Sequence, residues 1–299
     1  MPEALSVKPE PYQHHWTPGA RYNEIYTGWA YPPKDYATGS PVFTNDHVRM
    51  GIANQLRNLD SAFKIIASFP ELPNKPIVVG ESDPDGCAGC QGDQLGYRNG
   101  SIYASYTAAS IAREFQLADR QGVNLEGALT WAFEFEGQPL FAGFRVLASG
   151  GVDLPVLNVF RMLSQMGRQR LAVESDGAVP LDDMLQGGVR ARPDVRALAS
   201  RDKNRLCILA WHYHDDDLSG ADAEVGLTVV GLPPDVREAH CEQFRADAAQ
   251  SNAFTAWKAW VRRCNRPRNN SRSLRRPASS RNWTRRKISP SPTATPFCR

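Results

Sequence analysis

The chain has 299 residues, of which 41% are hydrophobic, and this is enough for one barrel of about 250 residues or for two ordinary domains. Its six cysteines are too few for a disulfide scaffold, and only Cys87 and Cys90 form a CxxC pair, so no zinc ribbon is predicted. Met1 is followed by no basic and apolar leader, and no run of about 18 apolar residues occurs. We therefore expect no signal peptide and no membrane helix in this sequence, which predicts neither a compartment nor an oligomeric state.

The net charge of +3 is unevenly distributed along the chain. From Lys258 onward there are 13 Lys and Arg residues and no acid, which leaves 22 bases and 32 acids in residues 1–257. Residues 258–299 are also rich in Ser and Pro, so we predict a basic, low-complexity tail that is disordered or read out of frame. A basic arm that binds nucleic acid or another polyanion is the alternative.

The first half of the chain alternates helical and extended patterns. Residues 1–47 show no sustained period and are predicted as loop, with a short strand near Met1–Ser6. The predicted helices are Ile52–Ile66, Ser101–Arg120 and Val156–Met166, and the predicted strands between them are Ile77–Gly80 and Gly127–Phe135. This alternation predicts parallel strands joined by right-handed helical crossovers.

After about Gly167 the helical period gives way to short alternating or β-branched runs. These predicted strands are Val195–Ala199, Leu206–Tyr213, Val225–Val230 and Glu238–Phe244, separated by Gly and Pro turns. We therefore predict an α/β chain with an incomplete (β/α)8 TIM barrel in residues 1–170. A small accessory β-sandwich is expected in residues 171–257.

Glu81 is the first candidate for catalysis, because it follows the buried strand Ile77–Gly80 and precedes the turn Ser82–Gly86. Parallel α/β barrels carry their chemistry at the carboxyl ends of their strands. The alternative is a structural acid that caps a helix or pairs with an Arg.

A second strand candidate, Leu129–Glu136, also ends in acids. Glu134 and Glu136 are two residues apart, so on a strand they would point the same way. Trp131 and Phe133 are predicted either as core residues or as a platform for a sugar ring. Arg145 is a candidate partner for one of the two acids.

Two further motifs are weaker. His212 and His214 share a strand face before Asp215–Asp217 and would suit a metal, but no third distant ligand is identifiable, so we predict a solvated strand end and no metal site. The pair Asn23-Glu24 is similar to a catalytic Asn-Glu motif but lacks the Pro that should follow it and lies in a stretch predicted as loop.

Longer motifs point to a family. The segments Pro76–Cys87, Leu125–Glu136, Phe141–Arg145 and Pro155–Met162 closely resemble bacterial β-xylosidases of glycoside hydrolase family 39. The resemblance implies a (β/α)8 barrel with an accessory β-sandwich and a retaining mechanism without metal or organic cofactor. It also implies that Glu81 is the nucleophile.

The same resemblance indicates the substrate, which is a xylo-oligosaccharide or an aryl xyloside. We expect the sugar to contact a set of aromatic and acidic residues, namely Trp29, Trp131, Phe133, Glu134 and Glu136. No nucleic acid or membrane partner is expected.

The chain departs from the family pattern in four ways. The acid/base Glu of the family lies in a Trp-Asn-Glu-Pro strand, and this sequence contains no such motif. The chain resembles the family from its third barrel strand, and between Tyr36 and Gly39 it joins two pieces that are far apart in relatives. Beyond Lys258 the similarity stops, and we expect a shift of reading frame there. These departures predict a fragment with little or no turnover, and a noncatalytic carbohydrate-binding or polyanion-binding remnant is the alternative.

Overall fold

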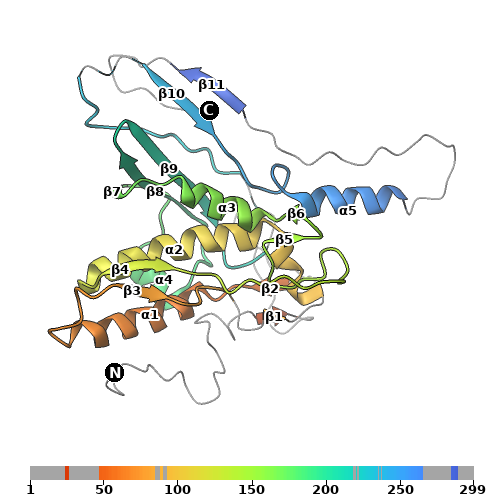
Figure 1. The fold of residues 1–299 in the computed structure, drawn as a ribbon, viewed down its shortest axis with the longest axis horizontal. Coiled ribbons are helices and arrows are strands. Elements are labelled where there is room, and N and C mark those ends of the chain that lie inside the picture. The colour runs from red at the N-terminus through yellow and green to blue at the C-terminus, as the bar shows by residue number, and fades with distance from the viewer. Residues whose placement is uncertain are drawn as a thin grey trace.

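The structure is a computed structural model, and it describes residues 24–26, 47–84, 88–89, 93–217, 220, 222–234, 236, 238–264 and 284–288 (Figure 1). Its helices are α1 (Ile52–Ala67), the 3-10 helix η2 (Asp93–Asn99), α2 (Ser101–Gln121), α3 (Pro155–Ser164), α4 (Leu181–Gly187) and α5 (Ala253–Cys264). The strands of the first half are β1 (Glu24–Tyr26), β2 (His47–Arg49), β3 (Ile77–Val79), β4 (Leu125–Ala128), β5 (Ala148–Ser149) and β6 (Val152–Asp153). Those of the second half are β7 (Gln169–Leu171), β8 (Asp194–Asp202), β9 (Arg205–Tyr213), β10 (Ala239–Gln243) and β11 (Thr284–Ile288). The strand expected near Met1–Ser6 lies outside the described residues, and the loop predicted for residues 1–47 is wrong at Glu24–Tyr26, which pair with β2 as strand β1.

A parallel strand–helix–strand unit, β3–α2–β4, forms the centre of the first half. Strands β3 and β4 pair in parallel, with Ile77 opposite Leu125 and Val79 opposite Ala128. Helix α2 ends at Gly122, whose φ of 65° is the left-handed conformation that closes many helices. The predicted helices in residues 52–66 and 101–120, the strand beginning at Ile77 and the parallel pairing are confirmed.

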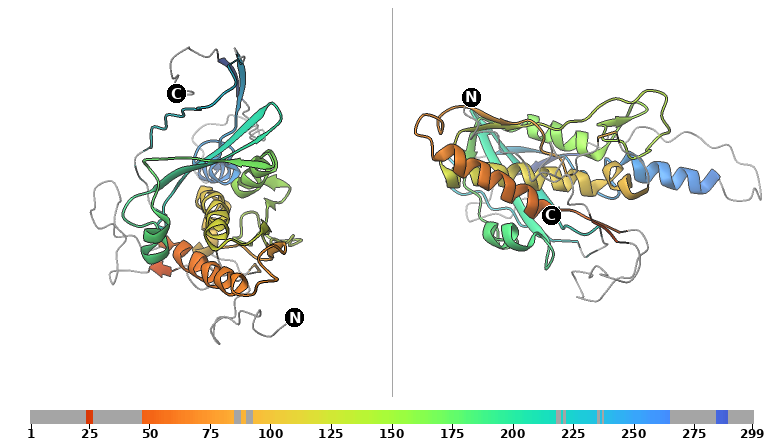
Figure 2. Two further views of the ribbon diagram at one scale, coloured as in Figure 1. Left: turned by 90° about the vertical axis from the view of Figure 1, so that its left-hand side faces the viewer. Right: turned by 90° about the horizontal axis from the view of Figure 1, so that it is seen from below.

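Helix α1 owes its position to one apolar face. Ile52, Leu56, Leu59 and Phe63 recur at helical spacing and are all buried. They pack toward α2, whose contacts with α1, α3 and β9 make it the central helix of the body (Figure 2). The helix therefore forms because burial of this stripe outweighs the absence of a capping side chain at Gly51.

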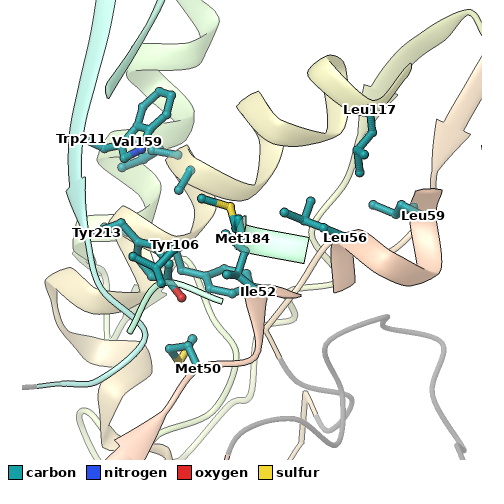
Figure 3. Close-up of a cluster of buried hydrophobic side chains, with 14 of the residues drawn as sticks. Met50, Ile52, Leu56, Leu59, Tyr106, Leu117, Val159, Met184, Trp211 and Tyr213 are labelled. Carbon is teal, nitrogen blue, oxygen red and sulfur yellow. The ribbon is translucent and has the colours of Figure 1, made fainter. Parts of the chain in front are cut away.

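The main core lies around α2. Figure 3 shows Leu56 and Leu117 on one side of it, and Trp211 and Tyr213 of β9 on another. Tyr106 meets Tyr213 edge to face, with ring centroids 5.8 Å apart. Such pairs stabilise by about 1 kcal/mol beyond their buried area. The core thus joins the parallel unit to the sheet of the second half.

The second predicted barrel strand is wrong over most of its length. Strand β4 ends at Ala128, and residues 129–135 are neither helix nor strand. Leu129 N still donates to Val79 O, but the next backbone donors go elsewhere, Trp131 N to the Asp83 carboxylate and Phe133 N to Arg145 O. The aromatic alternation is typical of a strand, but a side chain and a loop take the bonds that a neighbouring strand would need.

The second half contains the antiparallel sheet β7–β8–β9, in which Leu198 lies opposite Leu209. The predicted runs beginning at Val195 and Leu206 are therefore confirmed as β8 and β9, and Glu238–Phe244 contains β10. The predicted strand Val225–Val230 is wrong, because this run has no strand and Val230 is largely exposed. Strand β9 packs on α2, and β10 pairs with β11 (Figure 1).

The described strands form sheets of two or three, with no closed barrel among them. The incomplete barrel, its accessory sandwich and their boundaries stay predictions. Helix α5 runs past Lys258, where the family resemblance stops, to Cys264. None of the helices in the described residues is both long and apolar enough to cross a membrane.

The two parallel strands are covered unequally. Ile77, Val79 and Leu125 pack against the core, whereas Val78 and Leu129 are 53% and 54% exposed. Successive side chains on a strand point to opposite faces, so the exposed face is the one turned away from the core.

Candidate active site

Glu81 lies just past the carboxyl end of β3, where the sequence predicted it. Ser82 N donates to Leu129 O at 2.7 Å, so the strand pairing continues past Glu81 and fixes its backbone. The Glu81 side chain is 8% exposed. A carboxylate is therefore held at the tip of a parallel strand, nearly withdrawn from solvent.

Arg145 is the cation at this tip. Its Nη1 lies 3.5 Å from Glu81 Oε1 and 3.1 Å from Asp83 Oδ2, and its side chain is fully buried. The predicted pairing of Arg145 with Glu134 or Glu136 is wrong. Arg145 N donates to Ala88 O and Arg145 O accepts from Phe133 N, which directs the side chain to the β3 tip.

Asp83 organises the site on one side. Its Oδ1 accepts from Tyr103 Oη at 2.8 Å and from Thr130 Oγ1 at 2.6 Å. Its Oδ2 accepts from Trp131 N at 2.7 Å and from Arg145 Nη1 at 3.1 Å. Burial, then the Asp83 charge, raises the pKa of Tyr103 well above its usual value, so its hydroxyl stays a donor.

Ser82 connects the other side of the tip to the helices. Its Oγ donates to Glu114 Oε1 of α2 and accepts from Gln55 Nε2 of α1 at 2.9 Å. Gln55 Nε2 also reaches Glu114 Oε1 at 2.7 Å, and Tyr106 Oη donates to Gln55 Oε1. Burial raises the pKa of Glu114 to about 7, and the hydrogen bonds from Ser82 and Gln55 act against this rise.

The segment that follows β4 carries two exposed aromatic rings. Trp131 and Phe133 are 45% and 41% exposed, with ring centroids 5.2 Å apart. The segment is tied to the carboxylates, because Arg145 Nη1 also donates to Trp131 O at 3.4 Å. The backbone of Trp131 and Phe133 is thus bonded to Asp83 and Arg145 of the tip, whereas Trp29 lies outside the described residues.

Glu134 and Glu136 line a cavity that does not include Glu81. Both side chains are exposed, and the cavity of about 230 Å³ is formed mainly by residues 134–151. The two acids do share one hollow, but as members of an irregular segment and not of a strand.

The histidine run at the end of β9 was predicted to be solvated, but most of it is buried, and only its last residue, Asp217, is exposed. His214, Asp215 and Asp216 are all buried, and Asp215 accepts from Tyr213 Oη at 2.7 Å and from Val189 N at 2.9 Å. Burial raises the pKa of Asp215 to about 7. Asp215 thus accepts from one side-chain hydroxyl and from the backbone of a distant segment. The described residues contain no group of three His, Cys, Asp or Glu side chains that would suit a metal.

Asp83, Glu114 and Ser82 were missed as site residues. Ser82 and Asp83 were assigned to a turn because of the Pro and Gly that follow. Glu114 lies on the predicted helix Ser101–Arg120 between the buried Ile111 and Leu117, and an acid on an apolar helix face is the signal that would have found it.

Comparison of the chain with protein-family models, with curated proteins and with solved structures gave no match. Any function assigned to the chain therefore rests on its own residues and their geometry.

Proposed function

We propose that this chain is a fragment of a retaining β-xylosidase of glycoside hydrolase family 39, with Glu81 as its nucleophile and with little or no turnover of natural xylosides. The observation that carries the proposal is the Glu81 carboxylate at the carboxyl end of β3, ion-paired to a buried Arg. The segments that resemble the family include this strand end and the aromatic segment after β4. Acids and exposed aromatic rings together suit a sugar.

The chemistry begins with attack of a Glu81 oxygen on the anomeric carbon of xylose. The bond from this carbon to the leaving oxygen breaks, and the sugar becomes an ester of Glu81. Water then cleaves the ester and restores the carboxylate. The ion pair with Arg145 favours the charged carboxylate that such an attack requires.

A second carboxyl group, about 5–5.5 Å from the nucleophile, normally protonates the leaving oxygen and later activates the water. The sequence has no Trp-Asn-Glu-Pro motif to supply it. Glu114 is fully buried behind Ser82 and cannot reach a substrate. The proposed chemistry is therefore confined to substrates whose leaving group departs without a proton.

The decisive experiment offers the chain 2,4-dinitrophenyl β-xyloside with azide. Azide replaces water on the xylosyl ester, so we expect release of dinitrophenolate and formation of β-xylosyl azide. Glu81→Gln should abolish both, whereas Glu126→Gln, an exposed acid on β4, should not. No azide product from the parent chain, or equal product from Glu81→Gln, would contradict the proposal. Rapid hydrolysis of unactivated xylobiose would contradict the absence of an acid/base.

A noncatalytic carbohydrate-binding remnant is the second candidate. The exposed pair Trp131 and Phe133 favours it, because neighbouring aromatic faces can stack on sugar rings. Isothermal titration calorimetry with xylotriose measures binding without catalysis and so tests this second function. Binding that survives Glu81→Gln and disappears in Trp131→Ala, without any azide product, would favour this candidate over catalysis.

A further inference from the structure

Arg145 joins the two carboxylates of the β3 tip through a single nitrogen atom. Arg145 Nη1 lies 3.1 Å from Asp83 Oδ2 and 3.5 Å from Glu81 Oε1. The same nitrogen donates to Trp131 O at 3.4 Å. The shortest of these three contacts of Nη1 is the one to Asp83.

Asp83 is itself held from several directions. Tyr103 reaches it from α2, Thr130 and Trp131 reach it from the segment after β4, and all three are donors. An acid with this many donors has one orientation, and a buried Arg needs a fixed anion as partner. Asp83 therefore anchors Arg145, and Arg145 in turn contacts Glu81.

We propose that Arg145 is a positioning residue for Glu81, held in place by Asp83, and that it determines the pH range over which Glu81 acts as a nucleophile. This inference rests on the function proposed above. The carboxylates of Glu81 and Asp83 share the one positive charge of Arg145 in a buried site. Removal of the Arg145 or the Asp83 charge therefore changes how strongly the site favours the charged form of Glu81. Removal of the cation disfavours the Glu81 carboxylate, and removal of the Asp83 charge favours it.

The other titratable groups at this tip, within the described residues, do not reverse this balance. Tyr103 faces it from α2 through Asp83, and burial raises its pKa well above the usual value, so it stays neutral. Glu114 faces it from α2 through Ser82, and its pKa is raised to about 7. Its titration is common to the parent chain and to the variants below and can be removed by Glu114→Gln.

The test measures the rate at which 2,4-dinitrophenyl 2-deoxy-2-fluoro-β-xyloside labels the chain, as a function of pH, by intact mass. The fluorine slows the second step, so the first step is observed alone, and it needs no acid/base because the leaving group is activated. Arg145→Gln should raise the pH midpoint for labelling by about 1 to 3 units, the shift that a neighbouring opposite charge produces. Asp83→Asn should lower the midpoint.

Two controls separate positioning from a purely structural role. Arg98 is also fully buried and donates to Gly143 O at 2.9 Å, so Arg98→Gln tests the loss of a buried Arg that supports the loop leading to Arg145. It should lower the melting temperature without moving the midpoint. Arg145→Lys, which keeps a positive charge, should restore most of the parent profile even where Arg145→Gln folds poorly.

The outcomes are distinct. Shifts of the pH midpoint in opposite directions for Arg145→Gln and Asp83→Asn support the inference. General damage to the site would not move the midpoint up in one variant and down in the other. If the parent chain is labelled and both variants shift the midpoint in one direction, or neither shifts it, the inference falls and the proposed function stands. If the parent chain is not labelled at Glu81 at any pH, both fall.

Discussion

Replacement of Glu114 by Gln should make the free energy of unfolding less dependent on pH. Glu114 is fully buried, and burial raises its pKa from 4.5 to about 7. Between about pH 4.5 and 7, Glu114 therefore holds a proton in the folded state that it has released in the unfolded state. Stability from this group is complete below about pH 4.5 and is lost as the pH rises through 7.

The size of the effect follows from the separation of the two pKa values. About 2.5 pH units correspond to about 3 kcal/mol of unfolding free energy, and full burial leaves no solvent screening to reduce this. Gln resembles the protonated acid and keeps an oxygen to accept from Ser82 and Gln55. The variant should match the parent near pH 4.5 and be more stable by up to about 3 kcal/mol well above pH 7.

Urea unfolding followed by circular dichroism, repeated from about pH 4.5 to 8, measures this difference. The exposed Glu126→Gln serves as the matched control and should follow the parent. Asp215, whose pKa is also raised to about 7, keeps its own pH dependence in every variant, so some loss of stability remains. Parallel curves for parent and Glu114→Gln across this range would refute the reasoning.

Three further changes have defined outcomes. Asp194→Ala leaves the buried Arg113, 2.7 Å away, without its anion and should cost about 3–5 kcal/mol of unfolding free energy, measured in urea. Leu56→Ala empties a fully buried position between α1 and α2 and should cost about 2–5 kcal/mol by the same measurement, and a cost under about 1 kcal/mol would show that the site is not packed as described. Trp257→Ala removes the ring that lies 5.0 Å from Phe141 and should lower hydrogen-exchange protection in α5 by about 1 kcal/mol while leaving α2 unchanged.

The helices of the first half were predictable because the spacing of apolar residues within each segment shows which face is buried. Ile52, Leu56, Leu59 and Phe63 lie at helical spacing, so one face is recognisable without tertiary information. Glu81 was found for a similar reason, since a short apolar run ending in an acid is a local pattern. The end of β4 was misplaced because its limit is imposed by Asp83, a residue of another segment.

The rest of the site could not be read locally. Arg145 contacts an acid 62 residues earlier, and Glu114 contacts a serine 32 residues earlier. No periodicity joins such positions, and only the fold brings them together. The polar run at the end of β9 was predicted to be solvated because its residues are charged. Instead, Met50 N donates to Asp215 O and Val189 N donates to Asp215 Oδ2, both from distant segments, and these bonds allow the acid to be buried.

The outward face of the β3–β4 pair has a practical consequence. Parallel strands are normally covered on both sides, yet Val78 and Leu129 leave an exposed apolar surface on this pair. In the described part of the chain the two short strands form a sheet of their own. Such a surface invites chains to stick to one another as their concentration rises. The strands that position Glu81 thus also expose an apolar surface. A polar replacement at Val78 should raise the yield of soluble protein without changing the carboxylates.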